Sequence, residues 1–403
     1  MPFLVPLLAG IGLFPPLSSP CRYRASNVDR PGSCDIMDLM SPSEPRSRRD
    51  FLRGRTARGG DSAAKSKQNL SGDNQDASTD PTTRPYLMTV SRRAMACEFQ
   101  AYFNAGQYTQ AEEAALAAFD LVEQIESQLT IYRPESELSQ LNRHAGDDSV
   151  SVELNLFELL QRSFEIGAQT DEAFDITAGP LSKVWGFARR EGRVPEASEL
   201  SAALAHIGRP LVQLDGQQQT VHYLDPQVEI NLGGIGKGYA LDAAVESLES
   251  DGLSDVLLHG GKSSVVARGR NADLERGWVV GLVHPLNPKQ RLAEVTLIDK
   301  ALSTSGSGTQ SITHQGRRLG HILDPRTGWP AEGVLSATVV TASAAEADAL
   351  STALFVMGVD RAREFCQSRP EVQVALMVPD ERQGAVRMES FNLAADDWKF
   401  LDR

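Results

Sequence analysis

Cysteine, aromatic residues and long apolar runs are all scarce in this sequence. Its four cysteines, at positions 21, 34, 97 and 366, form no Cys-x-x-Cys pair and no cluster with histidine. This spacing argues against a disulfide scaffold and against a structural zinc site. Aromatic residues make up only 6% of the chain. No apolar run reaches the roughly 18 residues that an ordinary membrane-spanning helix needs.

Positive charge is also in deficit, since 40 Lys and Arg stand against 53 Asp and Glu, for a net charge of −13. This balance argues against a nucleic-acid backbone as the main partner. The charge is unevenly spread: residues 1–84 hold 12 basic and 9 acidic residues, and the remaining 319 hold 28 and 44. An acidic body that handles an anionic substrate needs local cations, a metal ion or helix N-termini.

The N-terminal segment differs in texture from the rest of the chain. Residues 41–85 are rich in Ser, Arg, Gly, Asp and Thr, and almost free of apolar residues after Leu52. Such a composition buries too little apolar surface to offset the conformational entropy of folding. We therefore predict a disordered or targeting segment over residues 1–84 and a folded domain over residues 85–403.

Two targeting signals compete within this segment. Residues 3–17 resemble a short apolar export segment, but no Lys or Arg precedes them. Residues 47–53 (SRRDFLR) resemble a twin-arginine export motif, although the next 18 residues lack the apolar stretch that should follow. A disordered basic linker is an equal alternative, and Met37 or Met40 is a possible start. Pro20, directly before Cys21, argues against a lipid-attachment site.

From residue 86 onwards, apolar periodicity predicts a mixture of helices and strands. Helices are expected over residues 110–129, 152–167, 196–207, 239–249 and 343–357, the last stopped by Gly358. Strand-like segments are 87–103, 221–231 (with Asp225-Pro226 as its turn), 256–258, 264–268, 278–284, 292–297, 336–341 and 373–378. Because the two types are mixed rather than strictly alternating, the predicted fold class is α+β.

The densest glycine loop, residues 231–239 (NLGGIGKGY), lies between a predicted strand and a predicted helix. Four glycines in six residues let a ligand approach the backbone, and the start of the next helix favours an anion. Tyr239 stands where a dinucleotide motif needs its third glycine, and Gly238 stands where a P-loop needs Ser or Thr. A purely structural turn is an equally good interpretation.

The predicted helix after Ser343 carries a possible cation site. Ser343 and Glu346 have capping-box spacing, and Asp348 and Thr352 are four residues apart, which places them on one helix face. A carboxylate and a hydroxyl arranged in this way can supply oxygen ligands to Mg²⁺. A solvated polar stripe is the more common meaning of such spacing. The apolar residues around the pair nevertheless indicate a buried helix, in which Asp348 needs a partner.

Three further segments carry candidate chemistry. In residues 320–330 (GHILDPRTGWP), His321 is a candidate general base and Arg326 a candidate phosphate clamp, although a turn with a satisfied histidine is the simpler interpretation. Trp185 and Phe187, beyond FDITAGPL (174–181), could stack on a flat ring or belong to the core. Residues 303–309 (STSGSGT) offer many donors or form a flexible loop.

Taken together and in order, these motifs resemble the ApbE family of FAD:protein FMN transferases. The similar segments are YRPESELSQLN (132–142), FDITAGPL (174–181), NLGGIGKGYALD (231–242), STSG (303–306), HILDPRTGWP (321–330) and ADALSTALFVMG (347–358). The resemblance covers residues 86–380 and implies a mixed-sheet, T-fold-like core. It also implies Mg²⁺-dependent transfer of FMN from FAD to a Thr or Ser hydroxyl of an acceptor protein, with release of AMP.

The resemblance also implies roles for individual residues. Metal ligands would be Asp348, Thr352 and the backbone carbonyl of Gly234, with Ser351 nearby, and His321 would activate the acceptor hydroxyl. Contacts with FAD would come from Met95, Tyr132, Ala173, Phe174, Asp175, Asn231, Lys237 and Ile322. Three places depart from the family pattern. Asn231 stands where Asp is usual, Lys262 stands where Glu is usual, and the Ser-Gly-Ser-Gly-Thr stretch around residue 307 replaces the usual Ser-Gly-Asp-Tyr.

Two other functions stay open at this point. A Mg²⁺-dependent FAD pyrophosphatase would use water in place of the acceptor hydroxyl and release free FMN and AMP. A non-catalytic FAD-binding or storage protein is the other alternative, which the Asn231 departure keeps open. The expected partner is an acceptor protein with a flavinylation motif, such as an electron-transfer subunit. The resemblance and the twin-arginine-like motif point to the bacterial envelope or periplasm, while a cytoplasmic location stays open.

Overall fold

The computed structural model describes residues 37–39, 86–187, 191–272, 277–308, 311–380 and 385–401. All of them belong to one unit, Cys34–Arg403. The two possible targeting signals, residues 3–17 and 47–53, lie outside the described residues, and the boundary between residues 84 and 85 stays a prediction. Within the described part of the chain, no helix combines the length and apolar character needed to cross a membrane.

Seven α-helices form in the described residues, each with an apolar face toward the interior. In the first, buried side chains recur at helical spacing from Ala111 to Leu129, as the sequence predicts. The helices are α1 (Ala111–Leu129), α2 (Glu137–His144), α3 (Leu154–Gln169), α4 (Gly179–Val184), α5 (Ala197–Leu204), α6 (Gly236–Ser250) and α7 (Ala344–Ser368). A 3-10 helix, η2, covers Arg209–Leu211.

An eight-stranded sheet, in which every neighbouring pair is antiparallel, forms the centre of the fold. Its order is β16-β15-β14-β11-β8-β7-β3-β2, so strands from both ends of the sequence flank the middle. The bounds in that order are Val386–Phe391, Gln373–Pro379, Ser336–Thr341, Lys300–Gly306, Ser264–Arg268, Val256–Gly260, Cys97–Asn104 and Leu87–Ala94. The mixed α+β fold predicted from the sequence is thus confirmed.

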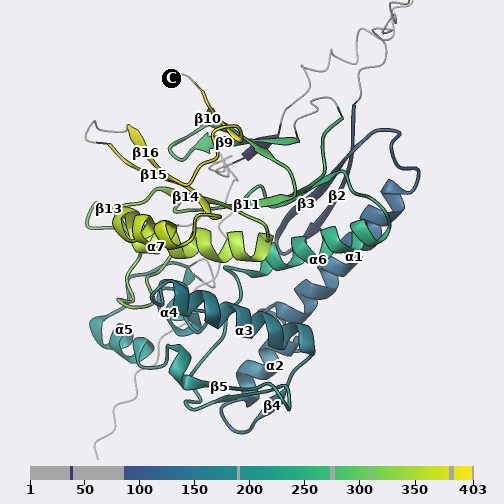
Figure 1. The fold of residues 1–403 in the computed structure, drawn as a ribbon. Helices are drawn as coiled ribbons and strands as arrows, with labels where there is room; N and C mark the ends of the chain where they lie inside the picture. The colour runs from purple at the N-terminus through teal and green to yellow at the C-terminus, as the bar shows by residue number, and fades with distance from the viewer. Residues whose placement is uncertain are drawn as a thin grey trace, which may run out of the picture. The chain divides into compact units, whose positions relative to one another are not determined.

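The two faces of this sheet contact different layers, because successive strand residues point to opposite sides. Val339 belongs to the main core, which includes α1, α6 and α7, whereas Val340 belongs to a second core with Trp278 and Trp398. Figure 1 shows α7, α6 and α1 along one face of the sheet, with β9 and β10 on the other. The sheet is therefore the wall between two apolar layers.

Three smaller sheets complete the described structure. The four-stranded sheet over the second core has the order β1-β9-β10-β17, with bounds Met37–Leu39, Trp278–His284, Asn287–Leu297 and Trp398–Phe400. A three-stranded sheet, β4-β6-β5, contains Val150–Ser151, Thr220–Tyr223 and Val212–Asp215. A hairpin of β12 (Ser311–His314) and β13 (Arg317–Gly320) comes directly before His321.

Several boundaries differ from the sequence predictions. The strand expected over residues 221–231 ends at Tyr223, because Asp225 and Pro226 turn the chain. Gly358 ends the first helical segment of α7 as predicted, since its φ of 74° is not helical, and a second helical segment that was not predicted follows it to Ser368. The segment from Ser303 to Gly306, open to interpretation as a flexible loop, is the end of the central strand β11.

Candidate functional site

A cavity of about 450 Å³ brings together the catalytic, metal-binding and FAD-binding residues that the resemblance implies, except Met95 and Tyr132. Its walls come from the turn before α4, the glycine loop that leads into α6, the end of β11, the segment after β13, and α7. The predicted residues that line it are Ala173, Phe174, Asp175, Asn231, Gly234, Lys237, His321, Ile322, Asp348 and Thr352. Segments far apart in the sequence thus converge on one space.

Asp348, on α7, is the buried charge at the wall of this cavity, with 3% of its surface exposed. The Lys237 ammonium lies 3.2 Å from both carboxylate oxygens, and the backbone N–H of Gly238 donates to Oδ2 at 3.2 Å. The hydroxyls of Ser264 and Ser303 lie 3.2 Å and 3.0 Å from Oδ1. A buried carboxylate needs such compensation, so the solvated-stripe interpretation of this helix face is wrong.

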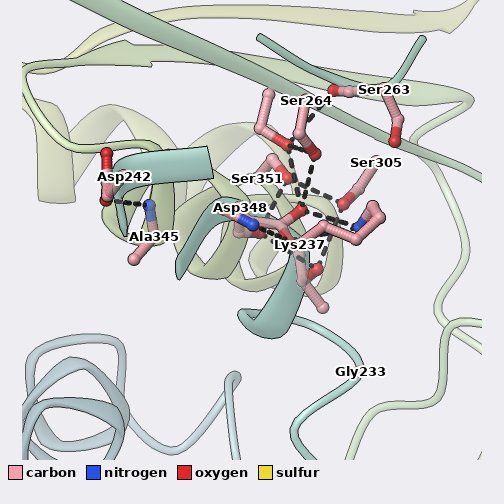
Figure 2. Close-up of polar contacts among 12 residues, drawn as sticks. Gly233, Lys237, Asp242, Ser263, Ser264, Ser305, Ala345, Asp348 and Ser351 are labelled. Carbon is pink, nitrogen blue, oxygen red and sulfur yellow. Dashed lines mark hydrogen bonds and ion pairs between the residues drawn. The ribbon is translucent and has the colours of Figure 1, made fainter. Parts of the chain in front are cut away.

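A group of hydroxyls continues the polar wall beyond Asp348 (Figure 2). The Ser305 hydroxyl lies 2.8 Å from that of Ser351 and 3.1 Å from that of Thr352. The Ser351 hydroxyl also donates to the backbone carbonyl of Asp348 at 2.9 Å. Ser305 therefore links the central sheet to the helix face that carries Asp348.

The donor chemistry of this corner fits a hard divalent cation. It offers one carboxylate and several hydroxyl oxygens, which are the ligand types that Mg²⁺ accepts. A Cβ atom added at Gly234 would lie 3.7 Å from the Thr352 hydroxyl, so the backbone of the glycine loop reaches this corner. The Lys237 ammonium, between the two Asp348 oxygens, shows that the carboxylate accepts a cation there. Among the described residues, no group of three or more His, Cys, Asp or Glu could hold a metal.

The glycine loop is shaped by contacts of its own side chains and by close helix packing. Asn231 Oδ1 accepts a hydrogen bond from the backbone N–H of Gly233 at 2.9 Å, which forms an Asx turn at the cavity wall. A Cβ atom at Gly238 would lie 2.0 Å from the carbonyl oxygen of Ala344. The absence of a side chain at Gly238 thus lets α6 and α7 approach closely enough for Lys237 to reach Asp348.

Asp242, one helical turn beyond Gly238, fixes the start of α7. Its carboxylate accepts hydrogen bonds from the Ser343 hydroxyl at 2.8 Å and from the backbone N–H groups of Ala344 and Ala345 at 2.8 and 2.9 Å. Burial raises the pKa of Asp242, and these hydrogen bonds oppose the rise. The predicted capping box is only half formed, because Ser343 accepts from the Glu346 N–H while the Glu346 side chain pairs with Arg162 and Arg369.

The cavity is also lined by a second carboxylate, that of Asp175. Its Oδ1 accepts from the backbone N–H and the hydroxyl of Thr177, at 2.7 and 2.6 Å. Burial raises the pKa of Asp175, and the two Thr177 hydrogen bonds act in the opposite direction. This short loop therefore holds a polar acceptor at the edge of the cavity, beside the apolar ring of Phe174.

His321 lines the cavity at the end of the β12–β13 hairpin. The Phe187 ring meets its imidazole edge to face, with the ring centres 6.5 Å apart. Trp185 is fully buried and its indole N–H donates to the carbonyl of Gly328 at 2.8 Å, so these aromatic residues belong to the core. The Arg326 guanidinium pairs with Asp324 in its own turn and does not line the cavity.

Met95 and Tyr132 do not line this cavity. Met95 has a φ of 48° in the turn between β2 and β3, and its N–H donates to Glu126 Oε2 at 2.7 Å. Tyr132 is 71% exposed and lines a separate, larger cavity of about 760 Å³. That larger cavity contains none of the other residues predicted for the site, so the smaller cavity is the candidate functional site.

The sequence did not indicate three residues that contribute to the site. Ser264 contacts Asp348, Asp242 holds the start of α7, and Ser182 on α4 lines the cavity. Ser264 and Ser303 are directly paired on β8 and β11, with both side chains fully buried. Buried serines at alternate positions of a strand were the available signal, since apolar residues normally occupy such positions.

Comparison with known proteins identifies relatives for most of this body. The model of the ApbE family matches residues 94–376. An FAD:protein FMN transferase from Klebsiella pneumoniae is 30% identical over 277 residues, which is 68% of this chain and 85% of that protein. An FAD:protein FMN transferase from Escherichia coli K12 is 32% identical over 258 residues, covering 61% and 73%. The solved flavin transferase ApbE from Vibrio cholerae superposes with a TM-score of 0.67 at 25% identity, covering 76% and 98%.

Proposed function

This chain belongs to the ApbE family, and we propose that it is an FAD:protein FMN transferase. It would move the FMN half of FAD onto a Thr or Ser hydroxyl of an acceptor protein. In this reaction the hydroxyl oxygen attacks the FMN phosphorus, the phosphorus–oxygen bond to AMP breaks, and AMP leaves with the electron pair of that bond. The products are a phosphodiester-linked flavin and free AMP.

The observation that carries the proposal is the convergence of Lys237, Asp348 and His321 on one cavity. Lys237 and the N-terminus of α6 supply positive charge for a diphosphate in an otherwise acidic protein. The imidazole of His321 can accept the proton of the attacking hydroxyl. Asp348, Thr352 and the Gly234 carbonyl would hold Mg²⁺, which when bound neutralises charge on the diphosphate.

Binding of the flavin and the ribityl chain would fall to residues that line the same cavity. Phe174 offers an apolar ring and Asp175 a carboxylate, and Ile322 faces the same space. Met95 and Tyr132 lie outside this cavity, so their proposed contacts with FAD require a ligand that extends beyond it. Export to the bacterial envelope is part of the same proposal and rests on the family resemblance and on the motif at residues 47–53.

The test mixes the full-length protein with FAD and Mg²⁺, with and without an acceptor fragment from a flavinylated electron-transfer subunit. AMP is followed by chromatography and covalent flavin by in-gel fluorescence. Acceptor-dependent AMP together with a fluorescent acceptor band supports the transferase. AMP and free FMN without acceptor would instead identify a pyrophosphatase, and bound FAD without AMP, with a panel of acceptors, would identify a storage protein.

Asp348→Asn is the matched variant for this experiment. The amide keeps the shape of the side chain but removes the charge that pairs with Lys237 and would bind the cation. We expect the rate of FMN transfer to fall at least about a hundredfold, since loss of a metal ligand costs more than loss of a supporting contact. If the protein only stores FAD, Asp348→Asn should keep its affinity for FAD, and neither wild type nor Asp348→Asn should transfer FMN.

A further inference from the structure

The Asp348 carboxylate is surrounded by two kinds of donor. The Gly238 N–H and the hydroxyls of Ser264 and Ser303 belong to buried elements and are fixed by the fold. The Lys237 ammonium sits at the end of a flexible chain whose side chain is 26% exposed. It is 3.2 Å from both oxygens (Figure 2), and both residues line the cavity.

We propose that Lys237 and the divalent cation compete for Asp348, so that Lys237 couples metal binding to dinucleotide binding. A cation cannot share both oxygens with an ammonium group that already lies against them, because the two positive charges repel. Of the donors around Asp348, Lys237 alone carries a positive charge and lies on a long, partly exposed side chain, and it is therefore the one displaced. This inference rests on the proposed function, since it assigns the displaced ammonium a partner in that reaction.

The displaced ammonium has a destination within the same cavity. Lys237 lines the cavity beside the glycine loop and the N-terminus of α6, where a diphosphate would gain both the helix dipole and a free cation. A lysine released from Asp348 by the metal thus becomes available to the dinucleotide, and a dinucleotide that binds the lysine frees Asp348 for the metal. Such coupling is reciprocal by thermodynamic necessity.

The test measures binding of Mn²⁺ to the full-length protein by the electron paramagnetic resonance signal of free Mn²⁺. The chains are wild type, Lys237→Met, Lys237→Arg and Lys399→Met. Lys399 is the matched control, since its ammonium pairs with the Glu294 carboxylate at 3.0 Å on the β9–β10–β17 sheet. Without FAD, we expect Lys237→Met to bind Mn²⁺ about tenfold more tightly than wild type, and the other two chains to resemble wild type.

A second series repeats the titration with FAD, which chromatography shows to remain intact. The diphosphate of FAD would attract the bound ion in both chains, so FAD should tighten Mn²⁺ binding in both. The effect should be about tenfold larger in wild type, where FAD also draws Lys237 away from Asp348. Equal or weaker Mn²⁺ binding by Lys237→Met without FAD, or an undiminished effect of FAD in that variant, would overturn the proposal. Lys237→Gln serves in its place if circular dichroism shows that Lys237→Met is unfolded.

Asp348→Asn fixes the location of the bound ion. It should lose the Mn²⁺ binding that Lys237→Met strengthens, and retention of wild-type Mn²⁺ affinity would place the ion elsewhere and overturn the proposal. The metal titration uses neither acceptor nor turnover. A protein that couples Mn²⁺ and FAD through Lys237 but transfers no FMN would therefore refute the proposed function and leave this inference intact.

Discussion

Asn231 is the residue at which this chain departs most clearly from the pattern it resembles, and the structure gives a reason why the change is tolerable. Its side-chain oxygen accepts the Gly233 N–H, a role that an Asp carboxylate fills equally well. The departure therefore alters charge at the cavity wall while it preserves the turn. We conclude that Asn231 acts first on the conformation of the glycine loop.

This conclusion predicts different effects for two substitutions. Asn231→Asp should keep the dissociation constant for FAD within about twofold, because the acceptor in the turn remains. Asn231→Ala should raise that constant about fivefold, which corresponds to the loss of one hydrogen bond worth about 1 kcal/mol. Quenching of FAD fluorescence measures both constants. Equal weakening by the two variants would show that the amide itself, not the turn, matters for binding.

The buried His259, which does not line the cavity, should make the stability of the protein depend on pH. Its side chain is 3% exposed, its Nε2 lies 2.8 Å from Gln100 Oε1, and its Nδ1 has no hydrogen-bond partner among the described residues. Burial, with a smaller contribution from Lys262, lowers the pKa of His259 from 6.5 to about 4. The folded protein therefore resists protonation that the unfolded chain accepts.

The sign follows from the lowered pKa. Above pH 6.5, His259 is neutral in both the folded and the unfolded chain and does not reduce the free energy of unfolding. As the pH falls from 6.5 toward about 4, only the unfolded chain gains the proton, and the free energy of unfolding decreases. Between pH 7 and 5 we expect His259 to lower the free energy of unfolding by about 2 kcal/mol. Urea denaturation of wild type and His259→Gln at both values measures the difference. An identical pH dependence in the two chains would contradict this account.

At the scale of elements, the contact between α6 and α7 is the one on which the site depends most directly. Gly238 faces the backbone of Ala344 so closely that Gly238→Ala must push the helices apart. We expect a loss of at least about 3 kcal/mol in the free energy of unfolding. Chemical denaturation provides the measurement.

Gly236 is the matched control for that substitution. It lies in the first turn of the same helix, and a Cβ atom added there meets nothing within 4 Å. Gly236→Ala should change the stability by no more than about 1 kcal/mol, since alanine favours a helix. Comparable destabilisation by both substitutions would mean that the glycine loop, and not the helix contact, limits stability.

The elements also show where sequence periodicity succeeds and where it fails. The long helix α1 was predictable because its apolar residues recur at helical spacing. The strands β8, β9 and β14 were predictable because they are short, mostly apolar runs bounded by turn residues. Strand β11 was not, because its hydroxyl residues satisfy buried partners on another element. Local patterns cannot show a partner 45 positions away, such as Asp348 for Ser303.

At the scale of the whole molecule, local sequence patterns also could not show how the site is assembled from distant segments. The resemblance supplied most of the cavity-lining residues, but the ion pair between Lys237 and Asp348 joins positions 111 apart and depends on the packing of two helices against the sheet. Spacing within one helix indicated Asp348 and Thr352 as a pair. The sequence patterns could not indicate that Ser264 and Ser303 contact Asp348, since that depends on the strand order β14-β11-β8.

The central sheet separates the site from the second core, and this division predicts which core substitutions affect binding. Val339 and Val340 are adjacent on β14, both almost fully buried, and they belong to the α7 side and the β9–β10 side respectively. Substitution of either by Ala should cost about 2 kcal/mol of stability, because each leaves a cavity in a packed layer. Only the Val339 side carries Ser264, Ser303 and the helix with Asp348.

The dissociation constant for FAD should therefore separate these two variants although their stabilities do not. We expect Val339→Ala to raise that constant severalfold, because α7 can shift into the space left beneath it, and Val340→Ala to leave it within about twofold. Fluorescence titration at a temperature where both proteins are folded, as verified by circular dichroism, makes the comparison. Equal effects on FAD binding would contradict this division and show that a change in the second core alters the site through the sheet.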